Sequence, residues 1–266
     1  MNDNILPPLE PQLVMPPVEQ PPPKKFWGAW ATIGFGVIIM VATFIVQGVV
    51  AVAFVVSELL SNLEVDIEDL TGKLLSDGNL FSAATIGSFI IGMILILIFI
   101  KVRQGAGFKE YLAINSISKR AGAAVIAVVI AFIAFSYGIS IILPEPSEPD
   151  IMLEAYKSVS WAPLLWIAAV ICAPIFEEAF FRGFLFTGLQ HSKVGTVGTI
   201  FLTALPWALL HIQYDIFQIA LIFFLGIILG IARSTTRSIW SPLIIHSFNN
   251  LLAMVEISLR VSGTLG

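Results

Sequence analysis

Two adjacent glutamates stand in an otherwise apolar stretch of the chain, and their type and spacing suit them to chemistry. Glu177 and Glu178 share the run 161–190 with Arg182, and no other charged residue interrupts it. An ionised side chain at the centre of a bilayer costs about 2.5 to 3.5 kcal/mol on insertion scales, so this pair requires a reason. On a helix Glu178 and Arg182 share a face, whereas Glu177 is about 100° away. We therefore expect Arg182 to neutralise Glu178 and Glu177 to face elsewhere, available for catalysis.

Three further polar residues occur in later apolar segments. His211 ends one such segment, and His246 lies four residues before Asn250, so the last two project from one side of a helix. Each group also has a purely structural interpretation. His211 could cap a helix, and the His246 and Asn250 pair could make interhelical hydrogen bonds. Likewise, Glu178 with Arg182 could be an ion pair that only fixes helix packing, which would leave Glu177 without a partner.

Together, a carboxylate, two imidazoles and an amide suit the hydrolysis of an amide bond. Poor solvation disfavours the charged form of a carboxylate, which suits Glu177 to act as a general base. One imidazole can hold the same water, while the second imidazole and the amide can donate to the developing oxyanion. Zinc is an alternative, with Glu177, His211 and His246 as ligands and water in the fourth place. Because HExxH spacing is absent and the ligands lie on three helices, the metal-free mechanism is favoured and no cofactor is expected.

The composition predicts a membrane protein. Of the 266 residues 57% are apolar and 12% are charged, and the mean hydropathy is +0.92. These values lie far outside the range of soluble domains, so the expected partners are the lipid bilayer and a membrane substrate, with no nucleic acid. Apolar runs near the length that crosses a bilayer predict an all-α, polytopic transmembrane bundle of about seven to eight spans. The expected spans are 26–57, 80–100, 121–143, 161–190, 195–210, 216–232 and 238–255.

The chain divides into two regions of different composition. Residues 1–25 hold eight of the fifteen prolines and little apolar surface, which predicts a disordered, Pro-rich cytoplasmic tail. Residues 26–260 form the expected transmembrane domain. Most Lys and Arg fall on one side of the expected spans and most Asp and Glu on the other. This asymmetry places the N-terminus inside, and we expect an integral protein of a bacterial cytoplasmic membrane.

Over residues 160–255 the chain resembles the CPBP family, also called the Abi or type II CAAX prenyl endopeptidase family of intramembrane proteases. The matching motifs are the EExxxR signature Glu177-Glu178-Ala-Phe-Phe-Arg182, the element Trp207-x-x-x-His211 and the pair His246-x-x-x-Asn250. One departure is Trp207, where the family usually has Phe. An aromatic ring is kept, so the departure concerns the shape of the pocket.

The resemblance implies an endopeptidase that cleaves a membrane-associated protein or peptide, including CAAX-type prenylated ones. It also implies roles: general base for Glu177 with His211, oxyanion donors for His246 and Asn250, and support from Glu178, Arg182 and Trp207. The family has been described both as metalloproteases and as glutamate-dependent proteases. Two other functions remain open, namely a transporter or proton-relay protein and a non-catalytic scaffold of the bacteriocin-immunity type.

The depths in the membrane expected for Glu177 and His211 conflict with a shared site. Counted at about 1.5 Å per residue, Glu177 and His211 lie on opposite sides of the bilayer midplane. They can meet if the helix of Glu177 continues to about Leu189, or if the segment before His211 enters the membrane less deeply.

Overall fold

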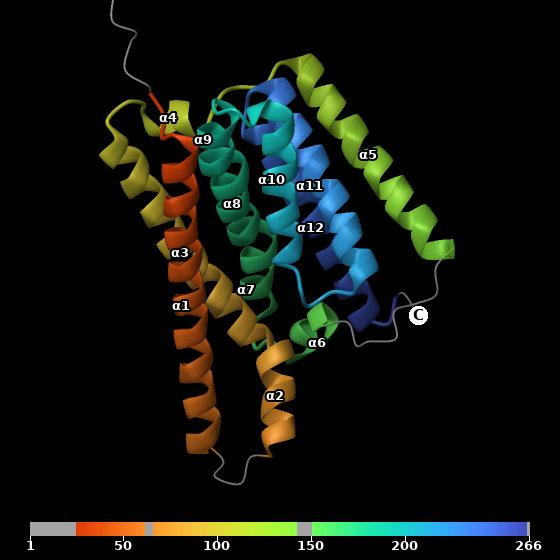
Figure 1. The fold of residues 1–266 in the computed structure, drawn as a ribbon. Coiled ribbons are helices and arrows are strands. Elements are labelled where there is room, and N and C mark those ends of the chain that lie inside the picture. The colour runs from red at the N-terminus through yellow and green to blue at the C-terminus, as the bar shows by residue number, and fades with distance from the viewer. Residues whose placement is uncertain (1–24, 62–65, 143–150, 265–266) are drawn as a thin grey trace, which may run out of the picture.

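The chain folds as a bundle of helices in the computed structural model, which describes residues 25–61, 66–142 and 151–264 (Figure 1). Within these ranges every regular element is a helix, so the all-α prediction is confirmed there. The predicted tail, except Lys25, lies outside the described residues, as does the acidic loop segment 143–150. The elements are α1 (Ala29–Ser61), α2 (Ile67–Ser76), α3 (Gly78–Arg103), α4 (Phe108–Tyr111), α5 (Lys119–Ile142), α6 (Ile151–Ser158), α7 (Ala162–Trp166), η1 (Ile167–Cys172), α8 (Ala173–Glu177), η2 (Glu178–Leu185), α9 (Phe186–Gln190), α10 (Gly195–Leu209), α11 (Ile216–Thr236) and α12 (Trp240–Val261).

Five helices of the described chain are long and apolar enough to cross a membrane. They are α1, α3, the continuous helix Ala162–Gln190, α11 and α12. Helix α5 corresponds to the expected span 121–143, but the structure does not describe several side chains near its C-terminal end. Helix α10 is apolar but has only 15 residues, about 22 Å of helix against a hydrocarbon thickness of about 30 Å. The expected count of seven to eight spans is therefore not confirmed.

The helix Ala162–Gln190 is the centre of the bundle. Half of its most apolar stretch is buried inside the protein, compared with 11% for α1, whose apolar side chains are largely exposed as lipid contact requires. Its segment η2 packs against α1, α3, α10, α11 and α12. Buried aromatic rings on this helix, Phe176, Phe180, Phe181 and Phe184, form the core with residues of α1, α3 and α12. Apolar packing therefore fixes the segment that carries both glutamates.

The central helix contains two π-helical segments, η1 and η2, which widen its turns. Such segments are frequent at functional sites, because one extra residue per turn displaces the side chains that follow. Segment η1 ends just before Pro174, which has no N–H to donate. Segment η2 begins at Glu178. The regular helical spacing assumed from the sequence is therefore altered on either side of Glu177.

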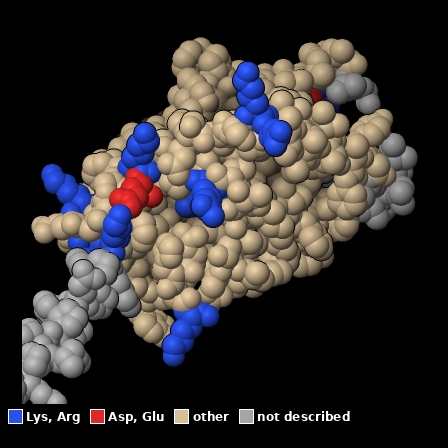
Figure 2. Space-filling model, turned by 90° about the horizontal axis from the view of Figure 1, so that it is seen from above, with Lys and Arg blue, Asp and Glu red and all other residues tan. Residues whose placement is uncertain are grey.

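The two ends of the bundle carry opposite charge. One end joins the start of α1, the end of α3, the start of α5 and the end of α11, and Figure 2 looks onto it, with Lys and Arg spread over the face and few acidic groups. Its basic residues are Lys25, Lys101, Arg103, Lys109, Lys119, Arg120, Lys193 and Arg237. The opposite end carries Glu58, Asp66, Glu68, Asp69, Asp77 and Glu154 among the described residues. We call the first of these the basic end.

Candidate active site

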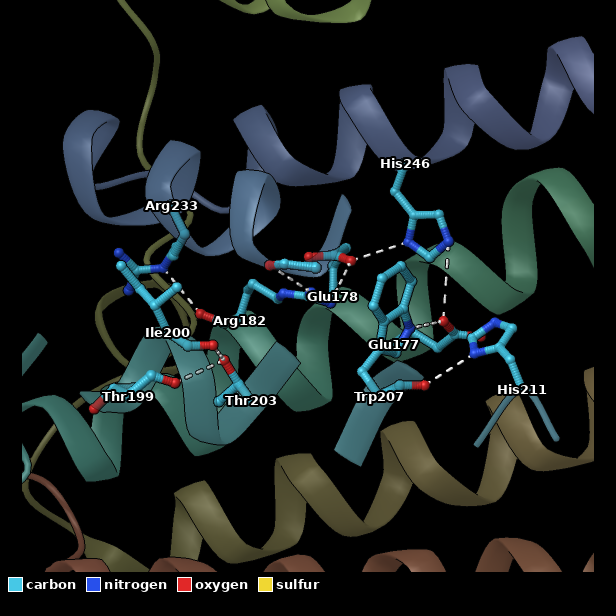
Figure 3. A network of polar contacts seen from close by, with 11 residues as sticks. Glu177, Glu178, Arg182, Thr199, Ile200, Thr203, Trp207, His211, Arg233 and His246 are labelled. Atoms are coloured by element: carbon cyan, nitrogen blue, oxygen red, sulfur yellow. Dashed lines mark hydrogen bonds and ion pairs between the residues drawn. The ribbon is translucent and has the colours of Figure 1, made fainter. Parts of the chain in front are cut away.

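The predicted pairing of Glu178 with Arg182 is confirmed. Arg182 Nη1 donates to Glu178 Oε1 at 3.0 Å, and both side chains are buried. Arg182 Nη2 donates to the carbonyl oxygen of Gly226 on α11 at 3.1 Å, and its guanidinium lies 4.6 Å from the centre of the Trp207 ring. The arginine thus joins η2 to α10 and α11 while neutralising the buried glutamate (Figure 3).

His246 on α12 lies between the two glutamates (Figure 3). Its Nδ1 is 2.9 Å from Glu178 Oε1, and its Nε2 is 3.9 Å from Glu177 Oε2. An ionised carboxylate only accepts hydrogen bonds, so Nδ1 carries the proton in this contact. No sequence pattern indicates the bond to Glu178, because it depends on how α12 packs against η2.

Glu177 faces away from Arg182, as its place on the helix predicts, and its side chain keeps 22% of its exposure. The indole Nε1 of Trp207 donates to its Oε2. The Trp207 side chain is itself buried and stacks edge-on against His246, with ring centres 5.2 Å apart. The sequence predicts only an effect of Trp207 on the shape of the pocket, and this hydrogen bond is not part of that prediction. The one signal for it is that tryptophan, unlike phenylalanine, carries an N–H donor.

His211 follows the end of α10 and is held by the same tryptophan. Its Nδ1 is 2.9 Å from the carbonyl oxygen of Trp207, and the two rings meet edge-on at 5.3 Å. Because a carbonyl only accepts, Nδ1 carries the proton, and in the neutral ring Nε2 is left as an acceptor. The ring of Tyr214 stacks on the other side at 6.3 Å. Glu177, His211 and His246 therefore all contact Trp207.

The structure brings Glu177 and His211 together, since both contact Trp207. The central helix runs unbroken to Gln190, which puts Glu177 near its middle. Helix α10 ends at Leu209, within one residue of the end expected from the sequence, and His211 follows two residues later.

Asn250 lies apart from these contacts. Its Nδ2 donates to the carbonyl oxygen of Ala169 in η1 at 2.9 Å. The N–H of Ala173 pairs with the carbonyl of Ala168, and the next residue, Pro174, has no N–H. Asn250 therefore supplies the donor that the proline cannot. Its expected role at the oxyanion stays a prediction.

Arg233 was expected in a loop after the sixth span, but it lies within α11 and only 5% of it is exposed. Its Nε donates to the carbonyl oxygen of Arg182 at 2.9 Å. In the sequence Arg233 directly follows the expected span 216–232, and no motif separates it from the exposed basic residues.

The zinc site considered from the sequence is not preassembled among the described residues. Among them, no group of three or more His, Cys, Asp or Glu side chains is arranged to hold a metal ion. Glu177 and His246 approach each other, and each histidine uses Nδ1 for a carbonyl or a carboxylate, which is also the arrangement of histidines that bind a metal through Nε2.

The comparison with protein families matches residues 159–252 to the family described as "Type II CAAX prenyl endopeptidase Rce1-like". All the motif residues, from Glu177 to Asn250, lie inside this interval. Comparisons with curated proteins and with solved structures gave no match. The matched segment comprises the central helix and helices α10, α11 and most of α12, which together build the site. Over residues 159–252 the chain is therefore similar to the Rce1-like type II CAAX prenyl endopeptidases.

Proposed function

We propose that this protein is an intramembrane endopeptidase that hydrolyses a peptide bond through a water activated by Glu177. The substrate class is a membrane-associated protein or peptide, and the family description favours CAAX-type prenylated ones. The observation that carries the proposal is the contrast between the two glutamates. Glu178 is buried and paired with Arg182, whereas Glu177 is partly exposed between Trp207 and His246.

In this mechanism Glu177 is the general base and His211 its partner at the water. The Trp207 N–H fixes one carboxylate oxygen of Glu177, which leaves Oε1 to accept the proton of the water. The carbonyl contact fixes the tautomer of His211, so that Nε2 can accept the second hydrogen of the water. Positioning the water in this way lowers the entropy cost of attack on the peptide carbonyl.

His246 and Asn250 are the proposed oxyanion donors. His246 already donates through Nδ1 to Glu178, so donation from Nε2 to the oxyanion requires the imidazolium form. Asn250 uses one donor for Ala169, and its amide has a second N–H to offer. Removing one oxyanion donor in other hydrolases lowers kcat by about 100- to 1000-fold, so these contacts carry much of the expected rate.

We infer a metal-free reaction, because Glu177 accepts a hydrogen bond from Trp207 and no three His, Cys, Asp or Glu side chains of the described residues are arranged to hold a metal ion. In this proposal Glu178, Arg182 and the Gly226 carbonyl form the rigid support of His246. Cleavage is expected to survive exhaustive chelation, and complete loss that added zinc restores would contradict the metal-free mechanism.

We further infer that the basic end faces the cytoplasm, which puts the N-terminus inside. The charge asymmetry between the ends supports this orientation. The 24 residues of α5 are long enough to add a crossing, and α10 with the loop after it carries the chain back to the opposite end before α11 begins, so the C-terminus lies outside.

The test is a comparison of wild type with Glu177→Gln and Glu178→Gln. Membranes from cells producing each protein are analysed by mass spectrometry for new peptide termini, so no substrate has to be assumed. Glu177→Gln should abolish the termini that wild type creates, because the amide cannot accept the proton. Its thermal unfolding midpoint should stay near that of wild type.

Glu178→Gln should behave differently, because it leaves the buried Arg182 without a counter-charge. Breaking such a pair costs about 3 to 5 kcal/mol, so the unfolding midpoint should fall clearly. Identical peptide termini in wild type and Glu177→Gln membranes would contradict the protease and favour a scaffold or transporter.

A further inference from the structure

A cavity of about 380 Å³ lies at the basic end, outside the site described above. It is formed by the ends of α9, α10 and α11 and by the connection between α4 and α5. The lining side chains are mostly polar and include Asn115, Gln190, His191, Thr196, Arg233 and Arg237. Two of these are arginines, and no Asp or Glu lines the cavity in the described part of the chain. The cavity therefore has a net positive lining.

Arg233 is the unusual member of this lining, because it is a buried guanidinium without a carboxylate partner in the described contacts. Its Nε donates to the carbonyl oxygen of Arg182 at 2.9 Å, and Nη2 reaches the hydroxyl of Thr187 at 3.5 Å. These acceptors are neutral, in contrast to the carboxylate that pairs with Arg182. Burying a charge without a counter-charge costs several kcal/mol, so an anion in the cavity would offset the desolvation cost of the Arg233 guanidinium.

The walls of the cavity are held together across the fold. Asn115 Nδ2 donates to the carbonyl oxygen of Arg237 at 2.8 Å, and the N–H of Ile239 donates to the carbonyl oxygen of Ala113 at 3.0 Å. Ala113 and Arg237 both have a φ of 53°, in the left-handed region that non-glycine residues rarely occupy. The ring of His191 stacks on Phe26 with ring centres 5.2 Å apart. The cavity is therefore formed before any ligand enters.

We propose that this cavity binds a phosphate group, supplied by the headgroup of an anionic membrane lipid. The planar fork of Arg donates two parallel hydrogen bonds to phosphate oxygens, and neighbouring amides and hydroxyls add neutral donors. Basic pockets between transmembrane helices on the cytoplasmic side are suited to phospholipid headgroups. The position among helix ends at the basic end supports a lipid, although inorganic phosphate offers the same oxygens.

The experiment measures binding to the full-length protein in a neutral detergent by calorimetry. The probes are short-chain phosphatidylglycerol, short-chain phosphatidylcholine and inorganic phosphate. Phosphatidylglycerol should bind at least about tenfold more tightly than the zwitterionic lipid, because only its headgroup has a net charge to balance the two arginines. Tighter binding of phosphatidylglycerol than of inorganic phosphate identifies the lipid as the source. Equal binding of these two probes would overturn the lipid assignment.

The deciding variant is Arg237→Gln, because Arg237 is exposed and its loss should leave the fold intact. It should weaken phosphatidylglycerol binding about tenfold, the size expected for one charge-assisted hydrogen bond. The matched control is Arg120→Gln, which removes an exposed arginine at the same end but outside the cavity. No binding by any probe, or equal weakening in both variants, would overturn the cavity site.

Discussion

At the scale of single residues, Trp207 makes the hydrogen bond that orients the Glu177 carboxylate. Its indole N–H donates to the carboxylate, and its ring packs against His211, His246 and the Arg182 guanidinium. The phenylalanine that is usual at this position in the family keeps the ring and lacks the donor. The tryptophan therefore adds a fixed orientation for Glu177 to the function of filling the pocket.

Replacing Trp207 by Phe tests this hydrogen bond. We expect kcat to fall about tenfold or more with KM little changed, since a hydrogen bond to a charged group contributes about 1.5 to 3 kcal/mol. The measurement is steady-state cleavage of a peptide identified by the terminus mapping. Trp240→Phe, at a half-exposed position on α12, is the control and should leave kcat unchanged. An unchanged kcat for Trp207→Phe would show that the indole only fills space.

At the scale of elements, the close crossing of α10 and α11 sets the position of Trp207. Gly226 on α11 lies directly against α10, and a Cβ there would be 3.0 Å from Trp207 Cε3 and from Ala204 Cβ. Gly230 is one turn further along α11 and equally tight, but a Cβ there would meet Ile200 at 3.0 Å. A Cβ at either glycine would therefore crowd the contact between α10 and α11 to a similar degree, but only the one at Gly226 would meet Trp207.

Alanine at these two positions separates packing from catalysis. Gly226→Ala and Gly230→Ala should lower the unfolding midpoint by comparable amounts, because both push α10 and α11 apart. Only Gly226→Ala should also reduce kcat several-fold, since it displaces Trp207 from Glu177. Thermal unfolding and peptide cleavage measured on the same preparations check both parts. An equal fall of kcat in the two variants would contradict a specific effect through Trp207.

At the scale of the whole molecule, the charge difference between the ends predicts the orientation in the membrane. A Cys172→Ala background removes the sole cysteine of the chain. In that background Ser262→Cys, near the C-terminus, should react with a membrane-impermeant maleimide added to intact cells. Ser116→Cys, at the basic end, should react only after permeabilisation, because we expect that end inside. Both positions are exposed in the structure, so the reverse labelling would show the opposite orientation.

The sequence alone determined the properties that depend on composition and on local spacing. A 57% apolar chain with long uncharged runs has to fold in a membrane as helices, where every backbone group is satisfied within its own segment. The four-residue spacing of Glu178 and Arg182 was enough to predict their ion pair and the separate direction of Glu177. Both conclusions concern neighbours along one helix, and the widened turns of η2 still leave Glu178 and Arg182 in contact.

Only the tertiary structure decided which side chains from different helices meet. The bond of His246 to Glu178, that of Trp207 to Glu177 and the use of Asn250 at Ala169 depend on helix crossings and on two π-helical segments. Neither crossings nor widened turns follow from periodicity, because they result from packing between residues far apart in the chain. That His211 and Glu177 meet at Trp207 depended likewise on how α10 packs against the central helix. The burial of Arg233 beside a cavity had no sequence signal at all, since an arginine at a helix end ordinarily reaches water.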